Sequence, residues 1–465
     1  MKPNPSRNVY RRVYPLDPRT LTQEQIAVTF AMTSRRPEAF DDIAKVVSEA
    51  KAADFHEKWV LNYGHASVAE HAILHLAVEN VSRLACDDLE DNRLASYTEK
   101  SSRYQLLERG SYHVPTEFRG HELEAVFTKT CDLLFDTYQA LVPKVVEHLK
   151  TAHPRLEKEK DAAYELRLQR LAAETCRFLL PAATLTNVGV TMNARTLEHA
   201  VTKLLSSYLA EERELGEELK AEGKKITPTL IKYADRSDFL ASPTNIQREL
   251  IPAQTVPHAP QQRLAVLVQD DPQAEKKVVA ALMYRLSGES YQTIWDRVQR
   301  MAVPDMEQVL DKVLGGMGPH DTPPREFEHA ELAFDLMMDY GAYREFKRHR
   351  MQSYVPQPLA VSNGYVLPDL IAQAGCEARF RKAIEEAEQA YRALCDAFPP
   401  QSAYIVTHAH YRRVLARMNI RECYHLFKLR TSPDAHPTLR KVMLEALESA
   451  RAAHPLLFKH LRLRQ

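Results

Sequence analysis

Glycine is scarce in this sequence, with 13 residues among 465. The usual share is about 7%, so few sharp turns are available. This scarcity argues against a β-sandwich or a propeller and favours a helix-rich chain. No run of eighteen apolar residues is present, so we expect no membrane-spanning helix. Basic and acidic side chains balance at 62 each, which excludes the overall positive charge that suits long nucleic acids. Any anion site must therefore be a local cluster of arginines.

The six cysteines form no CxxC pair. We interpret them as reduced thiols of a cytoplasmic protein and expect neither a disulfide framework nor a metal site. The first eighteen residues, MKPNPSRNVYRRVYPLDP, lack the apolar core of a signal peptide, which agrees with a cytoplasmic location. At 465 residues the chain is too long for one ordinary core, so two or three domains are expected.

Three pairs of segments resemble each other in the same order, which indicates a duplicated domain. The pairs are VAEHAILHLAVE with EFEHAELAFDLM, NRLASY with HRMQSY, and Met192–Arg195 with Met418–Arg421. Their offsets are 258, 257 and 226 residues, and the decrease is explained by extra residues in the first copy near 154–167. We predict a first domain at 1–235, a second at 263–465, and a linker at 236–262, where prolines are frequent and periodicity is weak.

Each copy is predicted to contain a helix, a strand, a short helix and then longer helices. The strands follow the Glu70-His71 and Glu328-His329 pairs, where apolar and polar residues alternate. The predicted helices after these strands are Ser82–Glu90, Glu122–Lys150, Ala162–Leu180, Leu197–Ala221, Tyr340–Lys347, Glu377–Ala397, Arg412–Leu429 and Thr438–Leu447. The expected fold class is therefore α+β with helices dominant.

Arginines concentrate in three places that could bind an anion. Arg348-His349-Arg350 ends a predicted short helix and offers fixed donors for phosphate, although a solvated basic helix end would look the same. The segment SYTEKSSRY, which ends at Tyr104, could form an anion-binding turn or an ordinary polar loop. In the third place, Arg421 and Lys428 are seven residues apart and share a predicted helix face.

Histidines near Glu70 could mimic a metal site. His71 lies beside Glu70, and His75 follows four residues later. Strand alternation would place His71 and His75 on one face and point Glu70 away. No further carboxylate or cysteine has ligand spacing, so we expect either a hydrogen-bonded His/Glu cluster or a ligand-facing histidine at His65, and no metal.

Taken together, these segments resemble the flavin-dependent (alternative) thymidylate synthases. That family has a hallmark of the form RHRxxSxNExSxRY, preceded by an HxTxxEH segment and followed by an N-A-R helix that ends in L-R. The first copy reads GHASVAEH, DNRLASYTEKSSRY and MNARTLEHAVTKLL. The second reads PHDTPPREFEH, RHRMQSYVPQPLAVSNGY and MNIRECYHLFKLR. The order and rough spacing agree in both copies.

The resemblance implies a fold and a reaction. The fold would be two tandem copies of a helix-rich domain like that of thymidylate synthase complementing proteins, each with an antiparallel or mixed sheet packed by helices. The reaction would be reductive methylation of dUMP to dTMP, with FAD reduced by NADPH and carbon supplied by methylenetetrahydrofolate. The protein would contribute positioning and electrostatics, because no Cys or Ser has a recognisable His base.

The resemblance also implies roles for individual residues. The nucleotide would be bound by Glu99, Ser101, Arg103 and Arg430, and Arg430 is the expected catalytic residue. The expected cofactor-binding residues are His65, Ser67, Arg93, Arg195, Arg348, His349, Arg350, Asn419 and Arg421.

The two copies depart from the hallmark in complementary ways. The first has Asp91 and Asn92 in place of Arg-His, and Leu204 in place of the L-R arginine. The second has VPQPLAVSNGY in place of the SxRY turn. Family members are homotetramers whose sites lie between subunits. We therefore expect a composite site that joins Arg103 to Arg430, in a chain that dimerises into a pseudo-tetramer with two competent sites.

Two other interpretations remain open. The motif losses also fit a nucleotide- or flavin-binding scaffold without catalysis, and Asp91 would repel a phosphate or a flavin pyrophosphate. A related flavoenzyme could instead methylate another pyrimidine nucleotide, such as UMP.

Overall fold

A computed structural model gives the structure of the protein and describes residues 11–62, 66–241 and 263–464. The chain divides into two compact units, each made of several segments. Unit 1 comprises Met1–Val81, Asp88–Lys100 and Thr186–Ala253, and unit 2 comprises Ser82–Asp87, Ser101–Leu185 and Gln254–Gln465. Unit 2 thus contains residues of both sequence copies. Most of the predicted linker, residues 242–262, lies outside the described residues.

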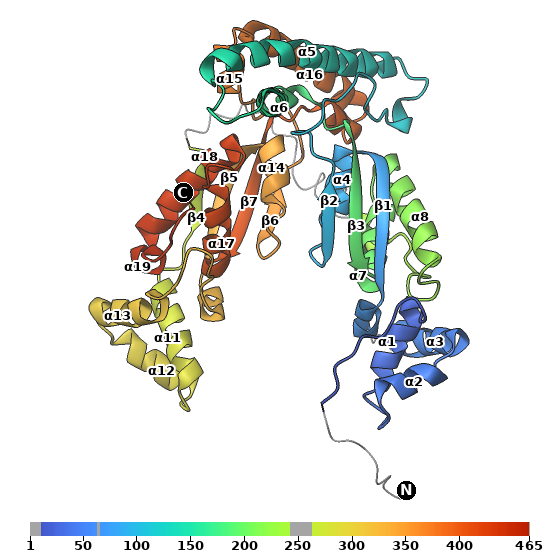
Figure 1. The fold of residues 1–465 in the computed structure, drawn as a ribbon, viewed down its shortest axis with the longest axis vertical. Helices are drawn as coiled ribbons and strands as arrows, with labels where there is room; N and C mark the ends of the chain where they lie inside the picture. Colours follow the sequence, from blue (N-terminus) through green and yellow to red (C-terminus); the bar gives the residue numbers. More distant parts are fainter. Residues whose placement is uncertain (1–10, 63–65, 242–262, 465) are drawn as a thin grey trace, which may run out of the picture. The chain divides into compact units, whose positions relative to one another are not determined.

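Unit 1 contains a three-stranded sheet with the order β1-β3-β2 (Figure 1). Its helices and strands are α1 (Gln23–Met32), α2 (Phe40–Val46), α3 (Glu49–Phe55), η1 (His56–Asn62), η2 (Ala66–His71), β1 (Ile73–Ser82), β2 (Ala95–Glu99), β3 (Leu185–Asn193), α7 (Ala194–Leu205), α8 (Ala210–Lys224) and α9 (Asp238–Ala241). Helix α8 packs closely at Gly223, where an added Cβ would lie 2.6 Å from Ile231 Cδ1 and 2.7 Å from Leu197 Cδ2. The short helix α4 (Arg83–Leu89) is divided between the two units.

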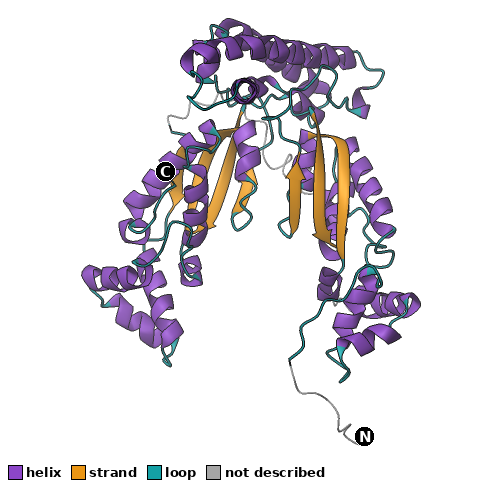
Figure 2. Cartoon of the chain, viewed as in Figure 1, coloured by secondary structure: helices purple, strands orange, loops and turns teal. Residues whose placement is uncertain are grey.

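Unit 2 contains a four-stranded antiparallel sheet with the order β4-β5-β7-β6. Its helices and strands are η3 (Thr116–Phe118), α5 (Leu123–Ala152), α6 (Asp161–Cys176), η4 (Arg177–Leu179), β4 (Ala265–Gln269), α11 (Ala274–Leu286), α12 (Tyr291–Gln299), α13 (Val303–Leu314), η5 (Arg325–His329), β5 (Glu331–Asp339), α14 (Tyr340–Phe346), β6 (Ser353–Pro356), α15 (Asp369–Gln373), α16 (Glu377–Ala397), η6 (Gln401–Ile405), β7 (Tyr411–Asn419), α17 (Ile420–Arg430), α18 (Pro437–Ala453) and α19 (Pro455–Phe458). Helix α18 packs on β4 and β5, and α5 packs against both α6 and α16. Figure 2 shows that helices predominate over strands. The predicted α+β class is therefore confirmed.

The two sheets share one strand register, as duplicated domains should. Ser96 in β2 pairs with Thr191 in β3, and Ser353 in β6 pairs with Arg417 in β7. These partners are related by the offsets of 257 and 226 residues found in the sequence. The order β1-β3-β2 likewise corresponds to β5-β7-β6.

Within unit 2, segments from the two copies pair backbone to backbone around Pro181 and Thr407, which form an isolated antiparallel bridge. The hydrogen bonds come in matched pairs. Ala182 N donates to Val406 O at 2.8 Å, and His408 N donates to Leu180 O at 2.9 Å. Each residue has its counterpart at an offset of 226, so the two copies meet in unit 2 with approximate twofold symmetry.

Two of the predicted helices are wrong. The segment predicted as the helix Arg412–Leu429 begins as strand β7, in which buried Val414, Ala416 and Met418 alternate with more exposed side chains. Period-two alternation specifies a strand, and only α17 is helical. The predicted helix Leu197–Ala221 is two helices, α7 and α8. Ser206 ends α7, and its Oγ donates to Thr202 O.

The other predicted helices are confirmed, although α18 continues six residues beyond the predicted end at Leu447 and α6 ends four residues before the predicted Leu180; α16 spans the predicted Glu377–Ala397. The prediction that His71 and His75 share a strand face is wrong, since η2 ends at His71 and β1 begins at Ile73. Among the described residues, no helix is both long enough and apolar enough to cross a membrane.

Candidate functional site

Three arginines gather around two glutamates in unit 2, and we call this set the arginine cluster. Its members are Arg103, Arg177 and Arg430 with Glu174 and Glu345. Arg103 lies in the turn after β2, where Tyr104 N donates to Ser101 O. The glutamates come from α6 and α14, and Arg177 begins η4. Arg430 ends α17, where a cation interacts favourably with the helix dipole.

The carboxylate of Glu345 links the first copy to the second. Its Oε1 lies 3.3 Å from Arg103 Nη2, and its Oε2 accepts from Arg430 Nη1 at 3.2 Å. Arg430 Nη2 also donates to the main-chain O of Glu345 at 3.2 Å. The structure thus brings together Arg103 and Arg430, which the sequence assigned to one composite site.

Arg177 is a buried cation at the centre of the cluster. Its Nη2 lies 3.8 Å from Glu174 Oε1 and 3.9 Å from Glu345 Oε1, and its Nη1 donates to Ser102 Oγ at 3.3 Å. Burial lowers the pKa of Arg177 to about 10, so it stays charged at neutral pH. Among the described residues, neither Arg177 Nη2 nor Arg103 Nε has a hydrogen-bond partner. Two buried guanidinium N–H groups of the cluster therefore lack a hydrogen-bond acceptor.

Arg430 is held from behind by a buried histidine. Its Nε donates to His349 Nε2 at 2.8 Å, and His349 Nδ1 lies 3.4 Å from Glu422 Oε1. Burial, followed by the nearby Arg430 charge, lowers the pKa of His349 to about 3, so the ring is neutral. A neutral ring that accepts at Nε2 carries its proton on Nδ1.

The other residues predicted to bind the nucleotide lie in local contacts. Ser101 Oγ accepts from Arg103 N at 3.2 Å, which shapes the turn that carries the arginine. Glu99 belongs to unit 1, where its Oε1 accepts from Thr186 Oγ1 at 2.9 Å. Ser101 is therefore beside a cluster arginine.

The five expected cofactor-binding residues of the second copy lie just after α14 or at the start of α17. Arg348 and Arg350 are exposed on either side of buried His349. Asn419 caps α17 by accepting from Glu422 N at 2.8 Å. Arg421 Nη1 donates to Glu328 at 2.9 Å and its Nε to Pro323 O.

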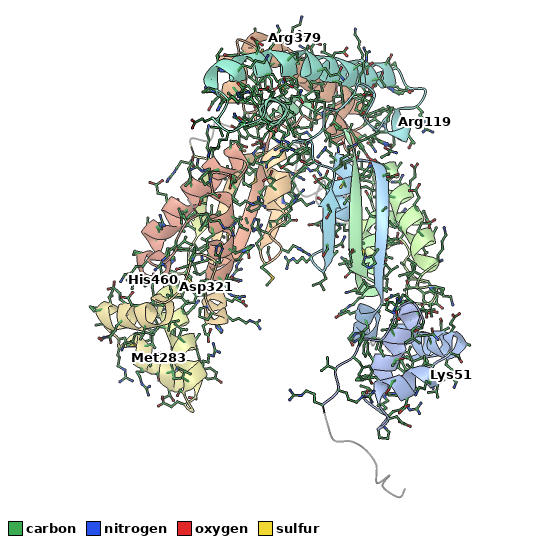
Figure 3. All side chains as sticks on the ribbon, in the orientation of Figure 1. Lys51, Arg119, Met283, Asp321, Arg379 and His460 are labelled. Atoms are coloured by element: carbon green, nitrogen blue, oxygen red, sulfur yellow. The ribbon has the colours of Figure 1, made fainter. Side chains whose placement is uncertain are left out.

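Arg421 and Lys428 share a face of α17, as predicted. Lys428 Nζ donates to the main-chain O of Asp321, which is labelled in Figure 3 and precedes the segment that Arg421 contacts. Both cations therefore anchor residues 321–328, whereas Arg430 faces the cluster.

In the first copy, Arg93 and Arg195 line a hollow of about 570 Å³ in unit 1. The other residues of its lining are Asp91, Asn92, Leu94, Thr196 and His199. Lys203 Nζ lies 3.4 Å from Asp91 Oδ2, so the unfavourable carboxylate has a local counter-ion. Arg195 also pairs with Glu70, as Arg421 pairs with Glu328 in the second copy.

The remaining predicted residues are His65, Ser67 and the histidines near Glu70. His65 lies outside the described residues, and Ser67 is exposed on η2. His71 packs on Phe30 with ring centroids 5.0 Å apart, and His75 Nδ1 lies 2.9 Å from Thr191 Oγ1. Over residues 11–62, 66–241 and 263–464, no group of three His, Cys, Asp or Glu side chains could hold a metal ion.

The cluster arginines Arg177 and Arg430 each have an equivalent position in the other sequence copy, and neither of these positions is an arginine. The counterpart of Arg177 is Ala403, and that of Arg430 is Leu204, which is buried in α7. Glu345 corresponds to Asp88. The duplicated positions therefore lack the cations that a second cluster would need.

Sequence reasoning missed Arg177, Glu174 and Glu345. Arg177 and Glu174 lie on one predicted helix, where an (i, i+3) pair looks like an ordinary surface pair. Glu345 lies in the short helix before the Arg348 triplet, with no local signal of its own. Only the approach of the two copies in unit 2 makes these residues neighbours.

Comparisons with known proteins agree with a duplicated domain. The family model described as thymidylate synthase complementing protein matches residues 18–229 and again 266–456. A protein of Chlamydia muridarum named UPF0159 is 32% identical over 421 residues, covering 87% of this chain and 80% of its own. A flavin-dependent thymidylate synthase of Clostridium tetani is 29% identical over 221 residues, covering 47% of this chain and 84% of its own.

Among solved structures, the flavin-dependent thymidylate synthase of Helicobacter pylori complexed with FAD and dUMP is 16% identical. The match covers 43% of this chain and 99% of that one, with a TM-score of 0.33.

Proposed function

The chain belongs to the thymidylate synthase complementing protein family, and from that premise we propose that it methylates carbon five of the uracil ring of dUMP to give dTMP. The methyl carbon would come from methylenetetrahydrofolate. The reducing equivalents would come from NADPH and pass through bound FAD, which supplies the redox chemistry. The protein's own part is to bind, orient and polarise.

The observation that supports this proposal most directly is the arginine cluster. Arg103 from the first copy and Arg430 from the second share the carboxylate of Glu345. Arg177 lies beside them with an N–H that has no partner in the described part of the chain. Each guanidinium group has the fixed fork geometry that suits a phosphate, and three of them come from three segments of the chain. Arg430, held by a neutral histidine, is the proposed catalytic residue.

The residues present also fit a flavin. Arg348 and Arg350 are exposed cations beside His349, and Arg93 and Arg195 line a hollow of about 570 Å³. Both sets suit the negatively charged pyrophosphate of FAD. Lys203 beside Asp91 reduces the repulsion that the carboxylate would otherwise exert.

The thiols support a mechanism without an enzymic nucleophile. Burial raises the pKa of Cys131, Cys176 and Cys423 above the usual value, so these groups stay protonated at neutral pH. A protonated thiol is a poor nucleophile. Electrostatic polarisation of the uracil ring by arginine fits the site better than attack by cysteine.

The proposal includes one nucleotide site per chain. The counterparts of Arg177 and Arg430 are Ala403 and Leu204, so an exchanged site would lack two cations. We further propose that the chain forms a homodimer with two competent sites, in place of the four of a homotetramer. Calorimetric titration of dUMP should give one site per chain, and the mass in solution should be that of a dimer.

Loss of cluster arginines tests the nucleotide site. Arg103→Ala and Arg430→Ala should each weaken dUMP binding by about 30- to 1000-fold, because each removes a charged contact of about 2–4 kcal/mol. Arg381→Ala is the matched control, since Arg381 forms an exposed ion pair with Glu377 on α16. Unchanged dUMP binding in either cluster variant would contradict the composite site.

Two further measurements separate this function from its alternatives. The purified protein should contain flavin, detected by its absorbance, whereas a scaffold that binds only a nucleotide would contain none; a flavin-binding scaffold would contain flavin but would fail the next test. With NADPH and methylenetetrahydrofolate present, dUMP should lose the hydrogen on carbon five. Loss from UMP but not dUMP would identify another pyrimidine nucleotide as the substrate.

A further inference from the structure

Glu345 occupies an unusual position, because one carboxylate contacts three guanidinium groups from three separate segments. Its oxygens lie 3.2 Å from Arg430 Nη1, 3.3 Å from Arg103 Nη2 and 3.9 Å from Arg177 Nη2. All three distances exceed the 2.7–2.9 Å that is typical of a charge-assisted pair. The carboxylate is thus shared among the three cations, with an ideal contact to none of them.

Resting on the proposed function, we propose that Glu345 is a resident counter-ion, which the phosphate of the nucleotide displaces from the arginines on binding. Three buried or half-buried guanidinium groups cannot remain unpaired without a large desolvation cost, so a vacant site needs an internal anion. The two oxygens of a carboxylate can accept a pair of hydrogen bonds from a guanidinium group, as two phosphate oxygens can. Glu345 therefore stabilises the free protein and competes with the substrate.

Glu174 provides the contrast within the same cluster. Its Oε1 lies 2.7 Å from Arg103 Nη2 and 3.8 Å from Arg177 Nη2, but neither contact has the geometry of a hydrogen bond. The structure gives it no contact with Arg430. The side chains of Glu174 and Glu345 are similarly exposed, at 22% and 18%. The two differ in which cations they contact: Glu345 bridges Arg103 and Arg430, so a phosphate that binds both of these arginines takes the place of Glu345.

Glu345→Gln removes the negative charge of the side chain and keeps its shape. This variant distinguishes a counter-ion that the phosphate displaces from a residue that only positions the arginines. Titration of inorganic phosphate and of dUMP should show that Glu345→Gln binds both about tenfold more tightly than the original protein, because the competing charge is gone. If Glu345 only positioned the arginines, the same change would weaken binding. Glu174→Gln is the control and should tighten binding by less than about threefold, since its charge is not displaced.

A second variant guards against loss of folding. Glu345→Asp keeps the charge but shortens the side chain, so it cannot reach all three arginines. Its affinity for phosphate should lie between those of the original protein and Glu345→Gln.

The salt dependence of phosphate affinity gives a further test. It should be stronger in Glu345→Gln than in the original protein, because the net positive charge of the site rises.

The outcomes separate this proposal from the proposed function. Arg103-dependent binding of dUMP, with no gain in Glu345→Gln or an equal gain in Glu174→Gln, would overturn displacement alone. Failure of the original protein to bind dUMP or phosphate in an Arg103-dependent way would overturn both. Tighter binding in the Glu345 variants, with a clearly smaller gain in Glu174→Gln, supports both.

Discussion

Arg430 donates from Nε to Nε2 of His349 at a distance of 2.8 Å, where α17 ends. This contact requires an unprotonated ring nitrogen. Protonation of His349 would place two cations against each other inside a buried site, and burial alone already lowers the pKa of the ring. The guanidinium proposed to act on the substrate is therefore oriented by a neutral histidine, with Glu422 on its far side.

The first prediction concerns acid stability. The pKa of His349 is about 3 in the folded chain, below the ordinary value of 6.5. Between these values the unfolded chain binds the extra proton, so stability is intact above pH 6.5 and falls as the pH drops toward 3. Each such group contributes a slope of up to about 1.4 kcal/mol per pH unit. The buried rings of His408 and His436 also have lowered pKa values and add to the slope.

His349→Gln isolates the contribution of one ring. Glutamine cannot titrate but can still accept from Arg430 through its amide oxygen. Denaturant titrations at pH 7.5, 6 and 5 should show that the free energy of unfolding falls less steeply with decreasing pH in His349→Gln than in the original protein. The difference in slope should correspond to about one bound proton. Parallel declines in the two proteins would show that His349 binds its proton equally in the folded and unfolded chains.

Much of the architecture could be predicted from repetition in the sequence, and the local exceptions have physical causes. The 257- and 226-residue offsets predicted a duplicated domain, and the pairing of Ser96 with Thr191 and of Ser353 with Arg417 agrees with those offsets. Strand β7 was missed because its arginines make the segment look like an amphipathic helix, although every second residue is buried.

Part of the site could also be predicted, because motif residues keep their spacing whatever surrounds them. Arg103 and Arg430 were found in this way. Arg177 and Glu345 have no motif of their own, and their importance depends on how Pro181 meets Thr407 in unit 2. Neighbours that arise from a pseudo-symmetric contact between distant segments leave no signal in local sequence.

The second prediction concerns the lost arginine of the first copy. Leu204 is 1% exposed in α7, and a Cβ added at Gly216 of α8 would lie 3.1 Å from Leu204 Cβ. Leu204→Arg would bury a charge in this apolar contact, which should lower the free energy of unfolding by about 3–5 kcal/mol. Leu204→Met, which conserves volume, should cost less than about 1.5 kcal/mol. A stable Leu204→Arg protein that binds two nucleotides per chain would contradict the loss of the second site.

The third prediction concerns Asp339, the buried residue that caps α14. Its Oδ1 accepts from Ala342 N at 2.9 Å, yet burial raises the pKa of its carboxyl from an ordinary 3.8 to about 6. The folded chain therefore holds the proton more tightly than the unfolded chain, and the associated stability is present below pH 3.8 and lost as the pH rises through 6. The loss amounts to about 3 kcal/mol.

Asp339→Asn keeps an oxygen for the cap and removes the charge. Its free energy of unfolding at pH 8 should therefore be about 1–3 kcal/mol higher than that of the original protein, with little difference at pH 4. Asp339→Ala separates the cap from the charge, because it loses about 1 kcal/mol of capping at both pH values. A destabilised Asp339→Asn protein at pH 8 would instead mean that attraction between the carboxylate and nearby Arg177 outweighs the cost of burying the charge.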